Sequence, residues 1–366
     1  MNRLIITLFV LSSNIINAQD LDTLYLDTLT ENEMNFSDSI NLINQNNKML
    51  VESRKAYNNG LSSMNANDLI KAVSYFTDAI LIDSTFAMAY FNRANCYYKL
   101  KSKDPISDYQ QSFYYDSLNY EALYQIANIN REQEDINLAI DIYKRIISIN
   151  PLEPKAYYEL GNTYYHDKDI LNAIESYTRS IDIKRDANVF NDRASCFRLL
   201  GEYAKANADY LSAIKLDSEL AFVYNNLASV CRKQENLDDA LHYYSLAVET
   251  DVNYFLAYNN RAGLYIEMGY FDKAMEDILR SIEINTDYAP AYNNRGIIYY
   301  KQDKYDIALI EFNKAIELNN VYAKAYVNRG ICKQMVRDED GACNDWYTAS
   351  KLGVTIVEKY LSNDCQ

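Results

Sequence analysis

The chain has 366 residues, of which 49% are hydrophobic, and this content excludes an intrinsically disordered protein. Its formal net charge is −15 and its pI is near 4.7, which argues against nucleic-acid binding, because such binding needs a basic stripe that displaces counterions. Only nine glycines and four prolines occur, which favours helices, whereas 35 tyrosines require a structural or a binding explanation.

Residues 1–18, MNRLIITLFVLSSNIINA, have the organisation of a secretory signal peptide. Arg3 supplies the positive charge, Leu4–Leu11 the short apolar region, and Ala18 the small residue before a cleavage site at Gln19. The apolar run is shorter than the roughly 18 residues that a membrane span requires. We therefore expect a periplasmic or secreted protein with no transmembrane segment in the mature chain; a buried N-terminal helix is the alternative.

Residues 19–52 are expected to form an acidic lead-in and an N-terminal helix. Five acidic residues occur in the segment 19–37, and no Lys or Arg occurs between Gln19 and Lys48. This imbalance predicts a solvated, mobile segment. From about Asp38 to Arg54 the sequence is compatible with a helix that caps the region after it.

A column of small residues recurs every 33 or 34 residues, and a fixed period of this length is the signature of a stacked repeat array. Its members are Gly60, Ala94, Ala127, Gly161, Ala194, Ala228, Ala262, Gly296 and Gly330. A column of alanines follows twelve residues later: Ala72, Ala139, Ala173, Ala206, Ala240, Ala274, Ala308 and Ala342. Only the second unit, which is shortened at Pro105, lacks this alanine.

Large and mostly aromatic residues lie four positions before the first column and four positions after the second. Two antiparallel helices approach closely only where Gly or Ala lies at the crossing, and a neighbouring ring then fills the space beside it. Burial of these rings accounts for much of the tyrosine content. A single helix pair cannot bury both of its faces, so we expect consecutive units to stack.

This order of aromatic, small and alanine positions resembles the tetratricopeptide repeat (TPR), a helix-turn-helix unit of 34 residues. Nine units fit the residues 53–353 in this register. The resemblance implies an all-α fold, a right-handed α-solenoid superhelix with a concave face. Residues 354–366 read as an amphipathic helix that caps the last unit. The remaining flanks leave no room for a catalytic domain, so an enzyme is not expected.

An arginine and an acid occur together across the units. Position seven, counted from the first residue of each unit, is arginine in five units, and only there is the residue before the second-helix aromatic acidic. Because a partly buried guanidinium needs a matching carboxylate, we predict structural ion pairs rather than an anion-binding row. The predicted pairs are Arg93–Asp108, Arg193–Asp209, Arg261–Asp277, Arg295–Glu311 and Arg329–Asp345.

Position six is polar in units two to nine. It is asparagine at Asn92, Asn226, Asn260, Asn294 and Asn328. In the TPR family this position lies on the concave face, and the row resembles the asparagine ladder in the TPR region of O-linked N-acetylglucosamine transferases. The resemblance implies that these amides bind an extended peptide, since an amide both donates to and accepts from a backbone. The alternative is a merely solvated polar helix face.

Position five is aromatic in the first four units and asparagine in the next four. On the same family geometry, Tyr124, Tyr158, Asn225, Asn259 and Asn293 are expected to line the peptide-binding face. The groove would then have an aromatic N-terminal half and an amide-rich C-terminal half.

Two of the six cysteines, Cys343 and Cys365, lie near the end of the chain. The segment GACNDWYTASKLG and the final NDC resemble the closing segment of exported bacterial TPR proteins. In an oxidising compartment, the resemblance implies a possible disulfide that ties the end helix to the last repeat. No metal or cofactor is expected, because no Cys/His spacing suits zinc and no Gly-rich phosphate loop occurs.

We therefore expect a non-enzymatic, exported interaction scaffold that binds an extended peptide or partner segment in its concave groove. The alternative is a structural spacer or oligomerising component of the cell envelope. An accessory subunit of an enzyme complex is less favoured. The identity of the partner and the oligomeric state stay open at this point.

Overall fold

The computed structural model describes residues 18–365, with side-chain surroundings described for residues 38–362 and 365. Within this range the chain contains nineteen α-helices and one short 3-10 helix, and it has no β-strand. It divides into two compact units after Asp135, and each unit is described by itself. Of the expected signal peptide, only Ala18 lies within the described residues.

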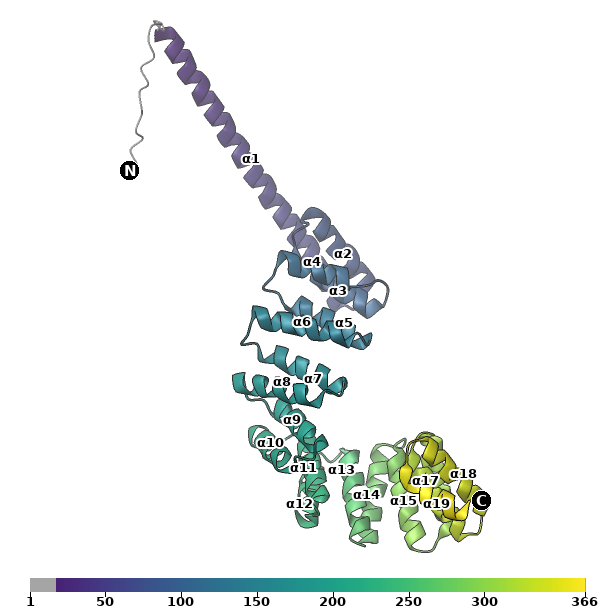
Figure 1. Ribbon diagram of the computed structural model, residues 1–366. Helices are drawn as coiled ribbons and strands as arrows, with labels where there is room; N and C mark the ends of the chain where they lie inside the picture. Colours follow the sequence, from purple (N-terminus) through teal and green to yellow (C-terminus); the bar gives the residue numbers. More distant parts are fainter. Residues whose placement is uncertain (1–17, 366) are drawn as a thin grey trace. The chain divides into compact units, whose positions relative to one another are not determined.

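The first unit contains five helices (Figure 1), and the first of them is by far the longest. They are α1 (Ala18–Asn65), α2 (Leu69–Ile82), α3 (Ala87–Leu100), α4 (Ile106–Tyr115) and α5 (Glu121–Glu132). The last part of α1 packs against α2, and Ser53 is the first fully buried residue of that contact. α1 therefore contributes the first helix of the first repeat, which is where the sequence places its beginning.

The expected lead-in at residues 19–37 is not a separate segment, because α1 is helical from Ala18 onward. The sequence explains this continuity, since neither glycine nor proline occurs between Ala18 and Asn59. The acidic composition was therefore a poor guide to the backbone, which stays helical in the absence of a breaker.

The second unit begins with α6 (Ile136–Ile149), continues with six helix hairpins and closes with a short cap (Figure 1). The hairpins are α7 (Pro154–His166) with α8 (Ile170–Ile183), α9 (Ala187–Leu199) with α10 (Tyr203–Leu216), α11 (Ala221–Lys233) with α12 (Leu237–Thr250), α13 (Phe255–Glu267) with α14 (Phe271–Ile284), α15 (Ala289–Lys301) with α16 (Tyr305–Leu318), and α17 (Ala323–Met335) with α18 (Glu339–Lys351). The expected all-α solenoid of stacked helix hairpins is confirmed.

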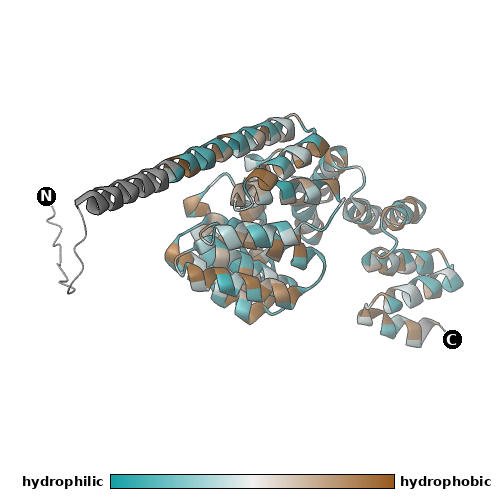
Figure 2. Cartoon of the chain, turned by 90° about the horizontal axis from the view of Figure 1, so that it is seen from above, coloured by the Kyte–Doolittle hydropathy of each residue, from teal (hydrophilic) through white to brown (hydrophobic). Residues whose placement is uncertain are grey.

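The small and aromatic columns meet inside each hairpin. A Cβ atom added at Gly161 would lie 2.6 Å from the ring of Tyr177, and one at Gly296 would lie 2.7 Å from the ring of Phe312. These rings are almost fully buried, and the alanine columns beside them are fully buried. Hydrophobic and hydrophilic residues alternate along the hairpin helices (Figure 2), so the apolar side of each helix faces its neighbours.

The turn within each hairpin needs a residue with positive φ. Only two of these residues, Gly201 and Gly269, are glycines; the others include Asn67, Lys168 and Asp303. Glycine adopts this conformation without steric cost, but most of these turns use another residue in its place. The chain can therefore form nine hairpin turns although it contains few glycines.

The last repeat is closed by η1 (Thr355–Val357) and α19 (Glu358–Asp364). The ring of Tyr360 stacks on Trp346 of α18 with centroids 4.7 Å apart, and Val357 is fully buried beside it. A disulfide joins Cys343 of α18 to Cys365, as the sequence led us to expect. Among the described helices, none has both the length and the apolar content that crossing a bilayer requires.

Candidate functional site

All five predicted arginine–acid pairs are present as ion pairs between the two helices of one hairpin. With aspartate, the guanidinium forms a two-bonded fork: Nε donates to Oδ2 at 2.7–2.8 Å and Nη2 donates to Oδ1 at 2.6–2.9 Å. Each guanidinium also lies 5.2–5.8 Å from the aromatic ring three residues before it. These arginines therefore have a structural role, which is to hold the two helices of their hairpins together.

The pair in the eighth repeat differs from the other four. Nη2 of Arg295 donates to Glu311 at 2.8 Å, but the buried Nε of Arg295 has no hydrogen-bond partner among the described residues. The longer glutamate side chain thus provides one bond where aspartate provides two.

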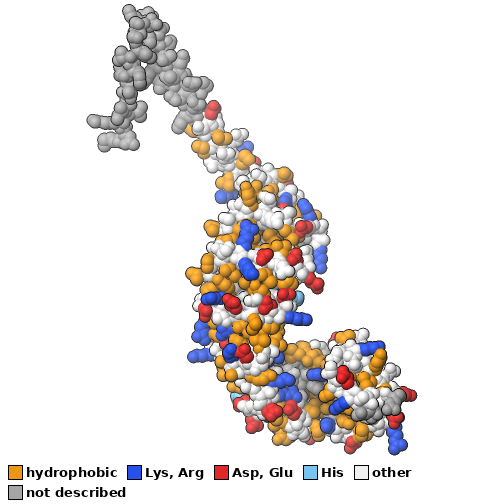
Figure 3. Space-filling model, viewed as in Figure 1, with side chains coloured by type: hydrophobic (Ala, Val, Ile, Leu, Met, Phe, Trp, Pro, Cys, Tyr) orange, Lys and Arg blue, Asp and Glu red, His pale blue; other side chains and the backbone are white. Residues whose placement is uncertain are grey.

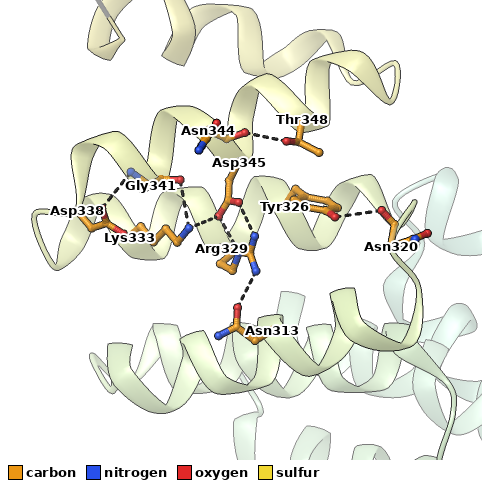
Figure 4. A network of polar contacts seen from close by, with 10 residues as sticks. All are labelled: Asn313, Asn320, Tyr326, Arg329, Lys333, Asp338, Gly341, Asn344, Asp345 and Thr348. Carbon is orange, nitrogen blue, oxygen red and sulfur yellow. Dashed lines mark hydrogen bonds and ion pairs between the residues drawn. The ribbon is translucent and has the colours of Figure 1, made fainter.

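Four of the arginines also reach back to the preceding repeat. Arg329 shows the arrangement in Figure 4, where Nη1 donates to Asn313 of α16 at 2.7 Å while Asp345 accepts the fork and a further bond from Lys333. The equivalent acceptors are Thr77, Thr178 and Ser245. Each such arginine therefore ties two repeats together, a role that comparing positions within single repeats does not reveal.

The asparagines of positions five and six form a ladder between neighbouring repeats, which we call the asparagine ladder. In each rung, Nδ2 of the position-six residue donates to Oδ1 of the position-five residue one repeat earlier, at 2.8–3.0 Å. The rungs are Asn226–Asn191, Asn260–Asn225, Asn294–Asn259 and Asn328–Asn293.

At Tyr57 and Tyr158, two tyrosines at position five, the hydroxyl group takes the place of the asparagine amide and bonds to the position-six residue of the next repeat. Asn92 donates to the hydroxyl of Tyr57 at 2.8 Å in the first unit. In the second unit the hydroxyl of Tyr158 donates to Asp192 at 2.9 Å. Burial raises the pKa of Asp192, although the hydrogen bonds from Tyr158 and Asn191 act in the opposite direction.

The prediction for position five needs a correction. Asn225, Asn259 and Asn293 are buried, with 3–7% of their surface exposed, and their carbonyl oxygens are occupied by the next repeat. Their first role is thus to hold neighbouring repeats in register, because a buried amide must be hydrogen-bonded. The position-six asparagines Asn226, Asn260, Asn294 and Asn328 are more exposed than these.

A groove of about 840 Å³ lies along the first helices of the last repeats in the second unit. It is lined by α11, α13, α15 and α17 and is continued by the cap segment. Its residues are Arg232, Asn259, Asn260, Gly263, Ile266, Glu267, Tyr288, Pro290, Asn293, Asn294, Ile297, Tyr322, Lys324, Val327, Asn328, Val354 and Ile356.

The groove combines a polar row with an apolar wall and few charges. Arg232 is neutralised locally, because its Nε donates to Glu267 at 2.8 Å. Among the described lining residues, Lys324 is the cation without an ion-pair partner. Burial raises the pKa of Tyr322 to about 12 and also raises that of Tyr288, so both phenols stay protonated at neutral pH. The groove therefore carries a small positive charge within a strongly acidic chain.

The groove brings together half of the predicted peptide-binding residues: Asn259, Asn260, Asn293, Asn294 and Asn328. The other five lie elsewhere: Asn92 and Tyr124 in the first unit, and Tyr158, Asn225 and Asn226 in the second.

The repeated small, aromatic and asparagine positions did not indicate the lining residues Lys324, Tyr288 and Tyr322 or the cap residues Val354 and Ile356. Lys324 is at position two of its repeat unit, and Tyr288 and Tyr322 are each the last residue of a unit, so their register could have indicated them. The cap residues lie outside the periodic region and carry no such signal.

Comparison with sequence profiles identifies five of the units. Profiles of the tetratricopeptide repeat match residues 120–151, 154–186, 223–253 and 256–288, and a second such profile matches residues 289–320. The chain therefore contains tetratricopeptide repeats. In the four remaining repeats the two helices also pack against each other, and Gly60 and Gly330 lie against the rings of Phe76 and Trp346.

Two solved structures resemble the chain. A TPR protein from Parabacteroides merdae is 21% identical with a TM-score of 0.58, covering 66% of this chain and 97% of its own. The Cut9–Hcn1 hetero-tetramer of the APC/C is 14% identical with a TM-score of 0.56, covering 86% of this chain and 76% of its own. At these identities the likeness shows the fold alone. No curated protein matches the TPR chain.

A TPR array is in general a scaffold for protein–protein interaction, because stacked hairpins present an extended face to a partner. That general role is the functional statement that the repeats themselves support.

Proposed function

We propose that this TPR protein binds an extended segment of a partner protein in the groove formed by α11, α13, α15, α17 and the cap. The proposal rests above all on one observation: Asn260, Asn294 and Asn328 follow one another along the groove at a spacing of one repeat. A regular row of amides suits a regular ligand, and an extended backbone is the regular ligand that proteins offer.

The chemistry of these amides supports the proposal. A side-chain amide has two N–H donors and one carbonyl acceptor. The rung to the preceding repeat uses one N–H of each position-six asparagine. The second N–H and the carbonyl oxygen match the acceptor and donor of a peptide group. Binding through the backbone tolerates different ligand side chains.

The wall beside the row suggests which segments bind best. Ile266, Ile297, Val327 and the cap residues Val354 and Ile356 give it an apolar character. An extended ligand places alternate side chains on opposite sides, so apolar residues at every second position would meet this wall. Lys324 favours a carboxylate at one end of the segment. The expected ligand is an extended segment with apolar side chains and an acidic group.

A selection of random linear peptides on the purified protein tests the proposal. Enriched peptides should show the alternating apolar pattern. The substitution Ile356→Asp should weaken their binding about tenfold or more, because it removes roughly 1.5 kcal/mol of apolar contact.

The matched control is Ile310→Asp on α16, since Ile310 is 64% exposed, Ile356 is 62% exposed, and only Ile356 lines the groove. Equal weakening by both substitutions, or enrichment without any pattern, would contradict groove binding.

The alternative function is that of a spacer or oligomerising component, and the exposed face of α1 favours it. The two functions are separable. Groove substitutions should abolish peptide binding and leave the molecular mass unchanged, whereas a pure spacer should lose nothing when the groove is altered.

We also propose that the protein acts after export. This is supported by the N-terminal sequence and by the Cys343–Cys365 disulfide, since such bonds persist in oxidising compartments. N-terminal sequencing of the protein from its source should begin at Gln19, and retention of Met1 would contradict export.

A further inference from the structure

We infer that the exposed face of α1 is a self-association surface, and that two copies of the chain pair through it as a parallel coiled coil. The inference does not rest on the groove. It concerns residues 38–52, which precede the first buried contact of α1 with α2 and are exposed throughout.

The first observation is the apolar content of this exposed stretch. Its large hydrophobic residues are each 40–66% exposed: Ile40, Leu42, Ile43, Met49, Leu50 and Val51. Figures 2 and 3 show hydrophobic residues on the part of α1 that follows its grey end. A helix that stands alone in water owes little stability to its own hydrogen bonds. An apolar face on such a helix indicates that another helix covers it.

The second observation is the spacing of these residues. Ile40, Ile43, Asn47 and Leu50 follow one another at intervals of three, four and three residues, which is the a/d pattern of a coiled coil. In the sequence the same intervals continue upstream through Leu26, Leu29, Glu33 and Phe36. The part of the seam from Ile40 to Leu50 is about 15 Å long at 1.5 Å per residue, and the upstream intervals in the sequence extend the pattern to more than three heptads.

The third observation is the placement of charge, which identifies the occupant as a second copy. In residues 38–52 the charged side chains are Asp38, Lys48 and Glu52, and all three fall on the outer b and f positions. The residues flanking the seam are uncharged: Ser39, Asn44, Asn46 and Val51. Within residues 38–52 two identical acidic chains therefore meet without like-charge repulsion, and upstream Glu33 is the one charged residue at an a position of the sequence pattern.

Asn47 sets the direction of the pair. A single asparagine at an a position favours a dimer in which it meets its own copy, because two buried amides can then bond to each other. This requires parallel helices in register. Both arrays then extend from the same end of the coiled coil, and the two grooves become linked in one assembly.

Sedimentation equilibrium on the purified chain tests the inference. The expected mass is twice that of one chain, and Ile43→Asp should raise the dissociation constant about 100-fold or more, because it removes two buried isoleucines from the seam. Gln45→Asp is the matched control, since it adds the same charge at an outer f position two residues away and should leave the mass unchanged.

Cross-linking tests the register. Asn47→Cys should give a covalent dimer under mild oxidation and Gln45→Cys should not; the four native free cysteines are buried. A monomer at all concentrations, a dimer insensitive to Ile43→Asp, or a dimer that Asn47→Cys does not cross-link would overturn the inference. So would a monomer that uses Ile43 to bind phosphatidylglycerol vesicles, which would assign the face to lipid.

Discussion

The eighth repeat offers a direct test of how the arginine forks stabilise the array. The substitution Glu311→Asp shortens the acid by one methylene and gives it the length found in the other four pairs. We expect the carboxylate to accept from both Nε and Nη2 of Arg295, as Asp277 does from Arg261 at 2.8 Å for each bond. The variant should therefore be more stable than the natural protein.

The magnitude follows from two opposing terms. A hydrogen bond to a charged group contributes about 1.5–3 kcal/mol, and here it satisfies the buried Nε of Arg295. The lost methylene costs about 0.8 kcal/mol of buried apolar contact. The net gain is about 1–2 kcal/mol. Arg295 does not recover the third bond of its counterparts, because Leu279 stands where Ser245 serves Arg261.

Urea denaturation and hydrogen exchange of α15 and α16 measure the effect. Exchange is informative because repeat arrays can unfold in parts, so a single unfolding free energy is not always defined. The reverse substitution Asp277→Glu is the matched control and should destabilise the seventh repeat by a similar amount. If Glu311→Asp destabilises the array, or if Asp277→Glu has no effect, the fork geometry is not the source of stability.

Three further predictions concern separate parts of the chain. Asp192→Asn should stabilise the array at neutral pH and lose this advantage on acidification. Burial raises the pKa of Asp192 in the folded state, so the natural protein becomes relatively more stable as this carboxyl is protonated. Parallel urea titrations of both proteins from pH 7 to pH 4 should show their unfolding free energies approaching each other. Gly296→Ala should destabilise by about 1 kcal/mol net, because overpacking outweighs helix propensity. Gly263→Ala should be neutral or stabilising in thermal melts, because the nearest atom to its Cβ would be a movable guanidinium nitrogen of Arg232 at 3.3 Å, with the amide of Asn294 at an ordinary 3.9 Å. Replacing Cys343 and Cys365 with serine should cost about 3 kcal/mol for a loop of this length, seen as faster hydrogen exchange confined to the cap, and unchanged exchange there would contradict a stabilising role.

The sequence predicted the arginine pairs well because both partners lie in one repeat. The nine repeats of this chain provide nine versions of the same two positions, which can be compared with one another. The acid and the arginine occur together in these versions because the two side chains are in direct contact. The forks of Arg93, Arg193, Arg261 and Arg329 are the physical result. The length of the acidic side chain also affects the geometry of the fork. Glu311 is the one glutamate among the five acids, and it accepts a single hydrogen bond from Arg295.

The asparagine ladder was harder to predict because its partners lie in consecutive repeats. Within one repeat, position six has no partner that varies with it. Across the repeat boundary, each asparagine at position five is followed by an asparagine at position six, as in Asn259 and Asn294. The cap residues Val354 and Ile356 were not predictable from the period, because they follow the last unit.

The ladder changes how its own function must be tested. Replacing Asn294 with alanine removes a possible peptide contact, but it also leaves Oδ1 of the buried Asn259 without its donor, at a cost of about 1–3 kcal/mol. Loss of binding in such a variant would not distinguish a lost contact from a loosened array. Lys324 and Ile356 lie in the same groove and are exposed, and neither takes part in a rung. Substitutions at these two positions therefore separate recognition from register, and a groove that binds its ligand should lose affinity through them while the urea midpoint stays constant.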